Sequence, residues 1–313
     1  MPKNSSQPNP WIHAARLRTL PLSLSGVILG SLIARWKLKT ITETWDIWVF
    51  VLALLLTVVF QVISNYANDY GDGIRGTDHA RADEAEARVV ASGRVTAKQM
   101  KIAVFILSLL ALVLIFVLLY RAFLPYYKES FYIFIGLGIA CILAAIGYTV
   151  GKKPYGYLGL GDLFVFIFFG WVSVLGSYYL FTKTFDPWLL LPASAVGLFS
   201  MAVLNLNNMR DIESDSSSGK RTLAVRLGFK KAMIYEIILL QLPLLLILIY
   251  VLHNRVQEYY GYIFVILFFP LINLRRRIME IKEPKELDPY LKQVAILCFM
   301  TALLVGVGLN LTR

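Results

Sequence analysis

The sequence predicts an all-α integral membrane protein with about nine transmembrane helices, and three observations support this. First, 58% of the 313 residues are hydrophobic and only 16% are charged, with a mean hydropathy of +0.64. Second, the apolar residues gather in segments that are mostly long enough for a helix to cross the hydrocarbon core. Third, the basic residues are distributed unequally between the two ends of these segments.

Nine apolar segments are recognisable, and polar stretches separate them. The eighth segment is the shortest. Residues 1–15, which precede the first segment, are expected to form a flexible cytoplasmic N-terminus. In chain order, the segments cover residues 20–34, 47–64, 102–119, 131–150, 163–181, 189–206, 233–252, 262–274 and 294–311.

The distribution of Lys and Arg predicts the orientation of these helices. If the N-terminus is placed inside, 23 of the 31 Lys and Arg residues fall on the inner side. Because cytoplasmic loops carry the excess of basic residues, this predicts an inner-membrane protein with its N-terminus and long loops in the cytoplasm and its C-terminus outside. The same distribution favours positive-inside loops over nucleic-acid binding as the reason for the net charge of +11. The expected surroundings are therefore a lipid bilayer, and no nucleic acid.

The first cluster of acidic and amide side chains, residues 65–78, follows the second apolar segment. Asn68 and Asp72 are spaced i,i+4 and share a helix face. Three glycines between residues 71 and 76 predict that the helix frays there, which would let Asp78 fold back towards Asp72. Carboxylates at the C-terminal end of a helix face its negative pole, so helix capping explains them poorly.

A second cluster follows the sixth segment on the same side of the membrane. Asn207, Asp211 and Asp215 are spaced i,i+4,i+8 and are predicted to share one helix face. Two facing clusters of oxygen ligands are typical of Mg²⁺ sites that bind a diphosphate. Solvated loops at helix ends are the alternative for each cluster. An ion-coupled transporter is another alternative, although transporter sites usually lie near the bilayer midplane at broken helices.

Basic and polar residues near the clusters are candidates for binding the diphosphate, with positive-inside topology as the alternative for each basic one. Tyr148 is either a hydrogen-bond donor to the diphosphate or an ordinary interfacial aromatic. Asp162 is either a helix N-cap or a substrate contact. The basic candidates are Arg75, Lys152, Lys153, Lys220 and Arg221.

Four stretches of the sequence resemble the motifs of the UbiA superfamily of intramembrane prenyltransferases. They are Arg-Leu-Arg-Thr-Leu-Pro at 16–21, Asn-Asp-Tyr-Gly-Asp-Gly-Ile-Arg-Gly-Thr-Asp at 68–78, the segment 148–162, and Asn-Asn-Met-Arg-Asp-Ile-Glu-Ser-Asp at 207–215 with its continuation to 223. The resemblance covers nearly the whole chain. It implies a single domain over residues 1–313, with two pseudo-repeated four-helix halves and a ninth helix around a central cavity that the cytoplasmic loops cap.

The resemblance also implies a branch of this superfamily. In the 4-hydroxybenzoate branch the first motif reads Asn-Asp-x-x-Asp-x-x-x-Asp, whereas here Gly stands at 76 and the last aspartate follows at 78. This spacing resembles that of the first motif in the branch that acts on 1,4-dihydroxy-2-naphthoate. The implied reaction transfers a polyprenyl group from polyprenyl diphosphate to this acceptor, with loss of CO₂ and diphosphate, and gives demethylmenaquinone for menaquinone biosynthesis. Another aromatic acceptor, such as 4-hydroxybenzoate or homogentisate, is the alternative.

The roles of individual residues are implied by the same resemblance. Asp72, Asp211, Asn68 and Asp215 would form the catalytic group. One Mg²⁺ would be held by Asn68, Asp72 and Asp78, with Asp69 as a further candidate, and the other by Asn207, Asp211 and Asp215. The diphosphate would contact Arg75, Tyr148, Lys153 and Arg210. The prenyl tail would lie among Phe, Leu and Ile side chains of the helices.

Overall fold

The computed structural model describes residues 9–39, 45–76 and 88–312, and every regular element in these ranges is a helix. Eight of the described helices are long and apolar enough to cross a membrane, which confirms the predicted all-α membrane fold. These eight are Pro10–Leu38, Ile47–Arg75, Ala97–Phe123, Lys128–Gly147, Gly161–Thr182, Pro187–Arg210, Phe229–His253 and Pro284–Leu311.

The eighth predicted segment forms a helix that differs from the others. It begins as a 3₁₀-helix, η6 (Tyr259–Leu267), and continues as α12 (Phe268–Met279), whose last turns carry Arg275, Arg276 and Arg277. A 3₁₀-helix rises about 2.0 Å per residue, so the two parts together extend roughly 36 Å. This element is therefore as long as the others, although its arginines make it less apolar, and the expected count of nine is approximate.

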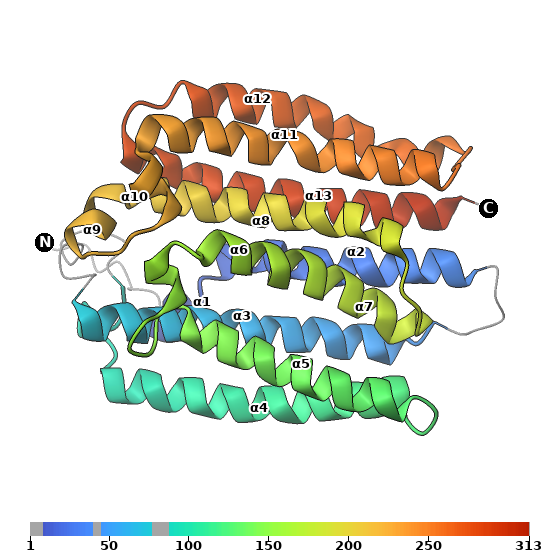
Figure 1. Ribbon diagram of the computed structural model, residues 1–313, viewed down its shortest axis with the longest axis horizontal. Helices are drawn as coiled ribbons and strands as arrows, with labels where there is room; N and C mark the ends of the chain where they lie inside the picture. The colour runs from blue at the N-terminus through green and yellow to red at the C-terminus, as the bar shows by residue number, and fades with distance from the viewer. Residues whose placement is uncertain (1–8, 40–44, 77–87, 313) are drawn as a thin grey trace, which may run out of the picture.

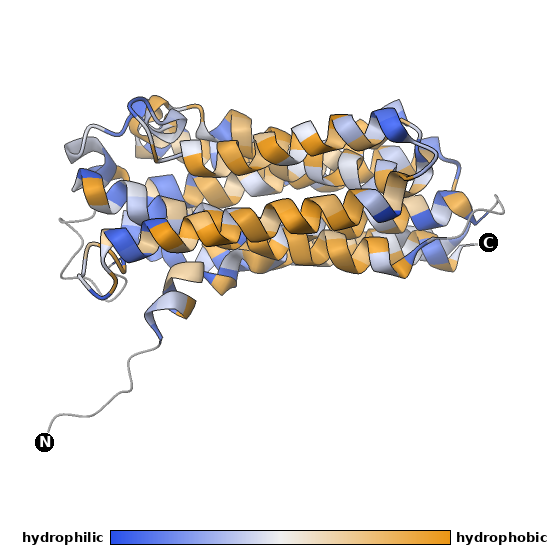
Figure 2. Cartoon of the chain, turned by 90° about the horizontal axis from the view of Figure 1, so that it is seen from below, coloured by the Kyte–Doolittle hydropathy of each residue, from blue (hydrophilic) through white to orange (hydrophobic). Residues whose placement is uncertain are grey.

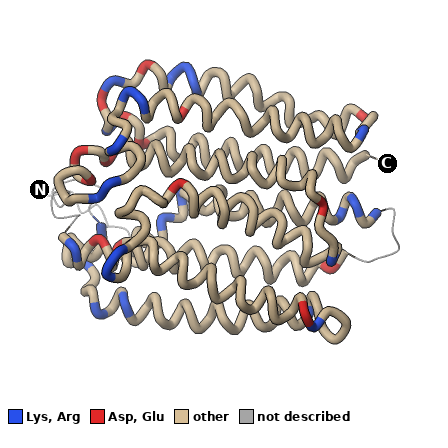
Figure 3. The backbone as a smooth tube through the Cα atoms, in the orientation of Figure 1, with Lys and Arg blue, Asp and Glu red and all other residues tan. Residues whose placement is uncertain are grey.

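The helices lie side by side with their polar connections at the two ends (Figure 1). In the view of Figure 2, hydrophobic residues dominate the middle of the helices and hydrophilic residues their ends, as expected for helices that cross a bilayer. Charged residues gather at the ends, most densely at the end that carries α9 and α10 (Figure 3). The principal helices are α2 (Leu20–Leu38), α3 (Ile47–Arg75), α4 (Ala97–Phe123), α5 (Lys128–Gly147), α7 (Ser173–Thr182), α8 (Leu190–Arg210), α11 (Phe229–His253) and α13 (Asp288–Leu311).

Short elements join these helices at the charged end and extend some of them. They are α1 (Pro10–Ala15), η1 (Leu17–Thr19), η3 (Tyr155–Leu158), α6 (Gly161–Val165), α9 (Ile212–Ser217), α10 (Leu223–Leu227) and η7 (Pro284–Leu287), with η5 (Pro187–Leu189) at the other end. Between α6 and α7 the helix widens into a π-helical stretch, Phe166–Val172. Helical widening of this kind often occurs at functional sites.

Local capping residues explain where several helices begin. Asp46 accepts a hydrogen bond from the backbone N–H of Trp48 and so caps α3. Thr96 and Gln99 form a reciprocal capping box at the start of α4. Each interaction satisfies backbone donors that the first helical turn leaves without an intrahelical partner.

Glycines allow α2 and α7 to approach closely. A Cβ atom at Gly30 would overlap Ser177 Oγ and the Val174 carbonyl oxygen, and one at Gly26 would meet the Ser173 side chain. Small residues at such contacts are the usual means of packing helices in a membrane, where van der Waals contact drives association.

Gly30→Ala is therefore expected to destabilise the protein by about 1–3 kcal/mol, because the backbone of α7 must move away. The matched control is Gly136→Ala in α5, where nothing lies within 4 Å of the added Cβ and alanine favours the helix. Thermal unfolding in detergent compares the two variants. A Gly30→Ala variant that melts with the wild type would contradict this packing.

The predicted fraying of the second helix is wrong for the described residues. α3 continues through Gly71 and Gly73 to Arg75 and ends at Gly76, whose φ of 74° provides a left-handed C-cap. Gly71 instead accommodates Thr149, and Gly73 accommodates the side chain of Val90. These glycines permit close packing of loops on the helix rather than its termination. Asp78 lies outside the described residues.

The helix face predicted to be shared by Asn207, Asp211 and Asp215 is wrong for Asp215, since only the first two line the cavity described below. α8 ends at Arg210, Asp211 has non-helical dihedral angles, and α9 begins at Ile212. The chain therefore turns at Asp211, so that Asn207 belongs to α8 and Asp215 to a separate short helix. The i,i+4,i+8 spacing did not predict this break because it contains neither glycine nor proline.

Candidate active site

A cavity of about 1300 Å³ lies between the helices. Its charged residues come from the ends of α3 and α8, from α9, from the segments around α1 and α13, and from the loops that carry Arg88 and Lys220. Acidic and amide side chains alternate there with basic ones. The charged residues and two of the amides that line the cavity are Arg16, Arg18, Asn68, Asp69, Asp72, Arg88, Asn207, Arg210, Asp211, Glu213, Lys220, Lys285 and Asp288.

The rest of the cavity is mostly apolar and lies among the membrane-spanning helices. α3, α4, α5 and the π-helical stretch before α7 supply its walls, for which Phe60, Leu118, Phe134, Leu137, Phe168 and Phe169 are representative. A charged head group at one end and a long apolar chain at the other would both be accommodated. The predicted environment of Phe, Leu and Ile side chains is present.

On α3, two buried carboxylates hold the neighbouring segments in place. Asp72 is 1% exposed and accepts hydrogen bonds from Tyr157 Oη at 2.7 Å and from Arg88. Asp69 accepts from Arg16 at 2.7 Å and from the backbone N–H of Val89 at 3.3 Å. Each aspartate therefore holds two chain segments against α3, and both line the cavity.

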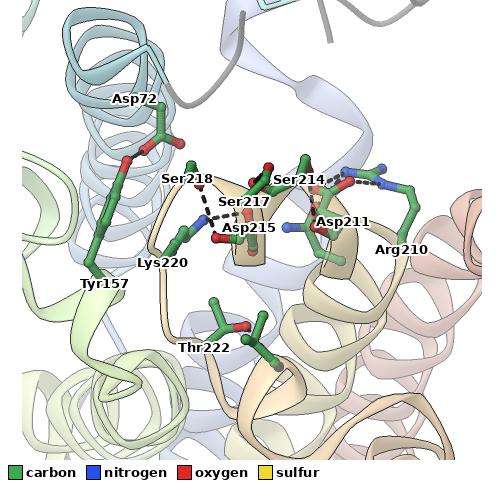
Figure 4. Close-up of polar contacts among 12 residues, drawn as sticks. Asp72, Tyr157, Arg210, Asp211, Ser214, Asp215, Ser217, Ser218, Lys220 and Thr222 are labelled. Carbon is green, nitrogen blue, oxygen red and sulfur yellow. Dashed lines mark hydrogen bonds and ion pairs between the residues drawn. The ribbon is translucent and has the colours of Figure 1, made fainter. Parts of the chain in front are cut away.

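On α8, Arg210 connects the second cluster. Its guanidinium binds Asp211 through two hydrogen bonds of 2.9 and 3.0 Å, as Figure 4 shows. It also donates to Asn207 Oδ1 at 2.9 Å and to Asp288 at the start of α13. Arg18 donates to the other oxygen of Asp288 at 3.1 Å. The planar guanidinium of Arg210 thus fixes the cavity-lining side chains of α8 relative to α13.

The third member of the predicted set, Asp215, is directed away from this group. It is 1% exposed, does not line the cavity, and lies 3.5 Å from Lys220 Nζ (Figure 4). The Lys220 ammonium also lies 5.6 Å from the centre of the Tyr157 ring, on which Arg75 stacks at 5.0 Å. Tyr157 therefore joins the end of α3 to the loop after α9.

Tyr148 lines the cavity and lies within the electrostatic influence of Asp72 and Asp215; its role as a donor to the diphosphate stays a prediction. It follows α5 and packs edge-on against Tyr155. Burial, together with the negative charges of Asp72 and Asp215, raises the pKa of the Tyr148 phenol. The hydroxyl therefore keeps its proton at neutral pH and remains a donor.

Several other predicted residues lie outside the cavity lining. Arg75 donates to the Gly151 carbonyl and stacks on Tyr157. Lys152, Lys153 and Arg221 are exposed and do not line the cavity.

Asp162 is in the first turn of α6, whose N-cap is Leu160, so the expected N-cap role at Asp162 is wrong. Its carboxylate instead accepts a hydrogen bond from Tyr235 on α11 at 3.2 Å. Asp162 does not line the cavity either.

Sequence reasoning missed the partners of the carboxylates: Arg16, Arg18, Arg88, Tyr157 and Asp288. Arg16 belongs to the motif at 16–21, but the motif did not predict a role for it. Its left-handed backbone (φ 48°) ends α1. Tyr157 stands between the quoted Tyr148 and Asp162. In the sequence, the two members of each pair are separated by at least 16 and by as many as 270 positions. No local spacing therefore predicts these pairs.

The donor set at the charged end suits a hard cation such as Mg²⁺, because its amide and carboxylate oxygens come from two helices. Among the described residues no three His, Cys, Asp or Glu side chains converge as a metal site. The predicted first set includes Asp78, outside these residues. Basic side chains now neutralise Asp72 and Asp211, so a bound cation would replace those partners.

The chain is similar to known membrane enzymes over almost its full length. Residues 38–296 match the UbiA prenyltransferase family. The 1,4-dihydroxy-2-naphthoate octaprenyltransferase of Haemophilus influenzae is 38% identical over 299 residues, which cover 96% of this chain and 95% of that one. The enzyme of the same name from Escherichia coli is also 38% identical and covers 98% and 97% of the two chains.

The fold is shared with a solved structure as well. The apo structure of a UbiA homolog from Aeropyrum pernix K1 superposes with a TM-score of 0.66 at 16% identity, covering 94% of this chain and 98% of the other. The apolar spans, the family match and these relatives together define an integral membrane prenyltransferase. The chain belongs to the UbiA prenyltransferase family.

Proposed function

We propose that this protein transfers a polyprenyl group from polyprenyl diphosphate to 1,4-dihydroxy-2-naphthoate in menaquinone biosynthesis. The observation that carries the proposal is a single cavity with a charged end and an apolar body. Its chemistry suits an anionic diphosphate with a long hydrocarbon tail. The acceptor is supported by the 38–41% identity to relatives named for this naphthoate.

The reaction breaks the bond between prenyl C1 and the diphosphate oxygen and forms a bond from C1 to a ring carbon. The ring carboxylate leaves as CO₂, and the prenylated dihydroxynaphthalene is the reduced form of demethylmenaquinone. Arg16, Arg88 and Arg210 line the charged end and supply donors for phosphate oxygens. Tyr148 retains its proton there and can donate to the departing diphosphate.

Mg²⁺ is the expected cofactor. Asn68 and Asp72 on one side, and Asn207 and Asp211 on the other, are the described side chains that would hold it. A divalent cation bound there would neutralise the charge that develops on the leaving diphosphate. The roles of Asp78 and Asp215 in such binding stay predictions.

The product distinguishes this function from its alternatives. With a defined polyprenyl diphosphate, the purified protein is expected to prenylate dihydroxynaphthoate but not 4-hydroxybenzoate or homogentisate, as judged by mass spectrometry. If the protein prenylates 4-hydroxybenzoate or homogentisate in preference to dihydroxynaphthoate, that compound is the acceptor instead. Uptake of ions into vesicles without release of diphosphate would instead indicate a transporter.

We further propose that the charged end faces the cytoplasm, as the excess of Lys and Arg on that side indicates. Single cysteines replacing Arg94 and Arg226, both outside the membrane-spanning helices, are expected to react with an impermeant thiol reagent only from the cytoplasmic side. The control is a cysteine replacing Arg255, which the topology places outside. Labelling of the first two from the external side alone would reverse the orientation.

A further inference from the structure

Three neutral polar side chains, those of Gln61, Ser23 and Thr19, line the cavity next to its charged end. They form the neutral polar group discussed below. Gln61 on α3 donates through Nε2 to Thr19 Oγ1 at 2.9 Å and accepts through Oε1 from Ser23 Oγ at 2.5 Å. Gln61 and Ser23 are 9% and 6% exposed, so their polar atoms are removed from the solvent outside.

The group retains hydrogen-bonding capacity for a ligand. A glutamine amide has two N–H donors and two acceptor lone pairs, and its bonds within the described residues use one of each. Ser23 donates its only proton to Gln61 and keeps lone pairs that can accept. An amide N–H and acceptor oxygens are therefore available at the cavity wall.

The position of the group along α3 relates it to the site of reaction. Gln61 and Asn68 are seven residues apart, which places them two turns and roughly 10 Å apart along the helix. The charged residues lie towards Asn68, whereas Gln61, Ser23 and Thr19 carry no charge. Phe60 lines the cavity beside Gln61 and offers an apolar surface.

Each part of the substrates fits a different zone. The diphosphate needs the basic end, and the hydrocarbon tail has no groups for hydrogen bonding. An aromatic diol has neutral hydroxyls that require donors or acceptors once it leaves water. The acceptor's own carboxylate is suited to the basic end, where Arg16 and Arg18 line the cavity.

We infer that Gln61, with Ser23, binds a ring hydroxyl of the aromatic acceptor and thereby sets its orientation and specificity. This inference depends on the proposed function. A hydroxyl that donates to Gln61 Oε1 or Ser23 Oγ places more electron density on the ring, and the ring must attack the allylic carbon. The inferred contact directs the carboxylate-bearing edge towards Asn68 and the diphosphate.

The test compares Gln61→Met, which keeps the length of the side chain, with the wild type. The KM for dihydroxynaphthoate is expected to rise about fivefold, as for loss of one hydrogen bond, while the KM for polyprenyl diphosphate stays within twofold. The matched control is Ser108→Ala on α4. Its hydroxyl also donates to a carbonyl of its own helix, that of Val104 at 2.8 Å, and it does not line the cavity, so both KM values should match the wild type.

Acceptor analogues separate a substrate contact from a structural role. Inhibition constants are measured for 1-hydroxy-2-naphthoate and 4-hydroxy-2-naphthoate, each of which lacks one hydroxyl. For one of them the difference between wild type and Gln61→Met is expected to vanish, because the partner of Gln61 is missing. The same difference for both analogues and for dihydroxynaphthoate would overturn the inference, as would an equal rise in both KM values.

Ser23→Ala provides a second variant if Gln61→Met does not fold, with the same expected pattern. Failure of the proposed function and failure of the inferred Gln61 contact give different results. If the wild type makes no prenylated naphthalene, the proposed function falls and the inference falls with it. If the wild type is active and neither variant changes acceptor KM, only the assignment of Gln61 and Ser23 is wrong.

Discussion

Asp72→Asn and Asp211→Asn are each expected to reduce turnover at least a hundredfold. An amide is nearly isosteric with the carboxylate but lacks the negative charge that would hold a divalent cation beside the diphosphate. Metal stabilisation of a leaving group contributes several kcal/mol, and each ~1.4 kcal/mol is tenfold in rate. Turnover is measured with saturating polyprenyl diphosphate, dihydroxynaphthoate and Mg²⁺. Retention of more than about a tenth of wild-type turnover by either variant would contradict the site.

The structure shows how to separate this effect from loss of folding. Asp72 and Arg88 form a buried ion pair with side-chain exposures of 1% and 11%, so Asp72→Asn alone removes the negative charge that faces the Arg88 guanidinium. Breaking such a pair costs about 3–5 kcal/mol. The double variant Asp72→Asn, Arg88→Gln is expected to recover most of the melting temperature but not the activity.

A surface substitution supplies the control for both aspartates. Glu280 is exposed and pairs with Arg276 at 3.3 Å on the surface of α12. Glu280→Gln should leave turnover and melting temperature near the wild-type values, since an exposed ion pair of this kind contributes at most about 1 kcal/mol. Recovered turnover in the Asp72–Arg88 double variant would show that the single variant failed by misfolding.

Removal of divalent cations is expected to have the largest effect of all. Dialysis against EDTA should abolish turnover, and Mg²⁺ in excess of the chelator should restore it. The reason is that a diphosphate carries several negative charges and cannot leave beside ionised carboxylates unless cations lie between them. Elemental analysis of the dialysed protein confirms that metal is gone. Undiminished turnover in that metal-free protein would exclude the proposed cofactor.

The sequence predicted the fold because a membrane-spanning helix can be recognised from its own stretch of sequence alone. An apolar segment of sufficient length is almost obliged to be helical, since the bilayer offers no other partner for its backbone groups. The structure places spanning helices in eight of the nine predicted segments and a less apolar helix in the remaining one. Helix ends were predicted less well, because Gly71 and Gly73 serve packing rather than termination.

The sequence predicted the acidic and amide residues of the candidate site, together with Tyr148, Arg210 and Lys220, but not the contacts that hold them in place. Asn68, Asp72, Asn207 and Asp211 are brought to one end of one cavity, as predicted. Their partners come from distant parts of the chain. Asp72 is bound by Arg88 and Tyr157, and Arg210 by Asp288. Such pairs depend on how helices pack, which periodicity along a single helix does not encode.

The exposed lysines illustrate the opposite error. Lys152 and Lys153 follow Tyr148 closely in the sequence, yet the described structure places Tyr148 at the cavity wall and both lysines on the exposed loop. Sequence proximity to a site residue did not predict direction, because the chain turns at Gly151, whose φ is 113°. Arginines of α8 and of the segments before α2 and α4 line the charged end instead.

The stoichiometry of a single turnover tests the central claim most directly. Dihydroxynaphthoate labelled in its carboxyl group is incubated with polyprenyl diphosphate, and CO₂, diphosphate and prenylated product are measured together. The wild type is expected to release one CO₂ and one diphosphate for each prenylated ring, and Asp211→Asn to release neither. Diphosphate release without CO₂ and without a prenylated ring, or equal yields from Asp211→Asn, would contradict the account.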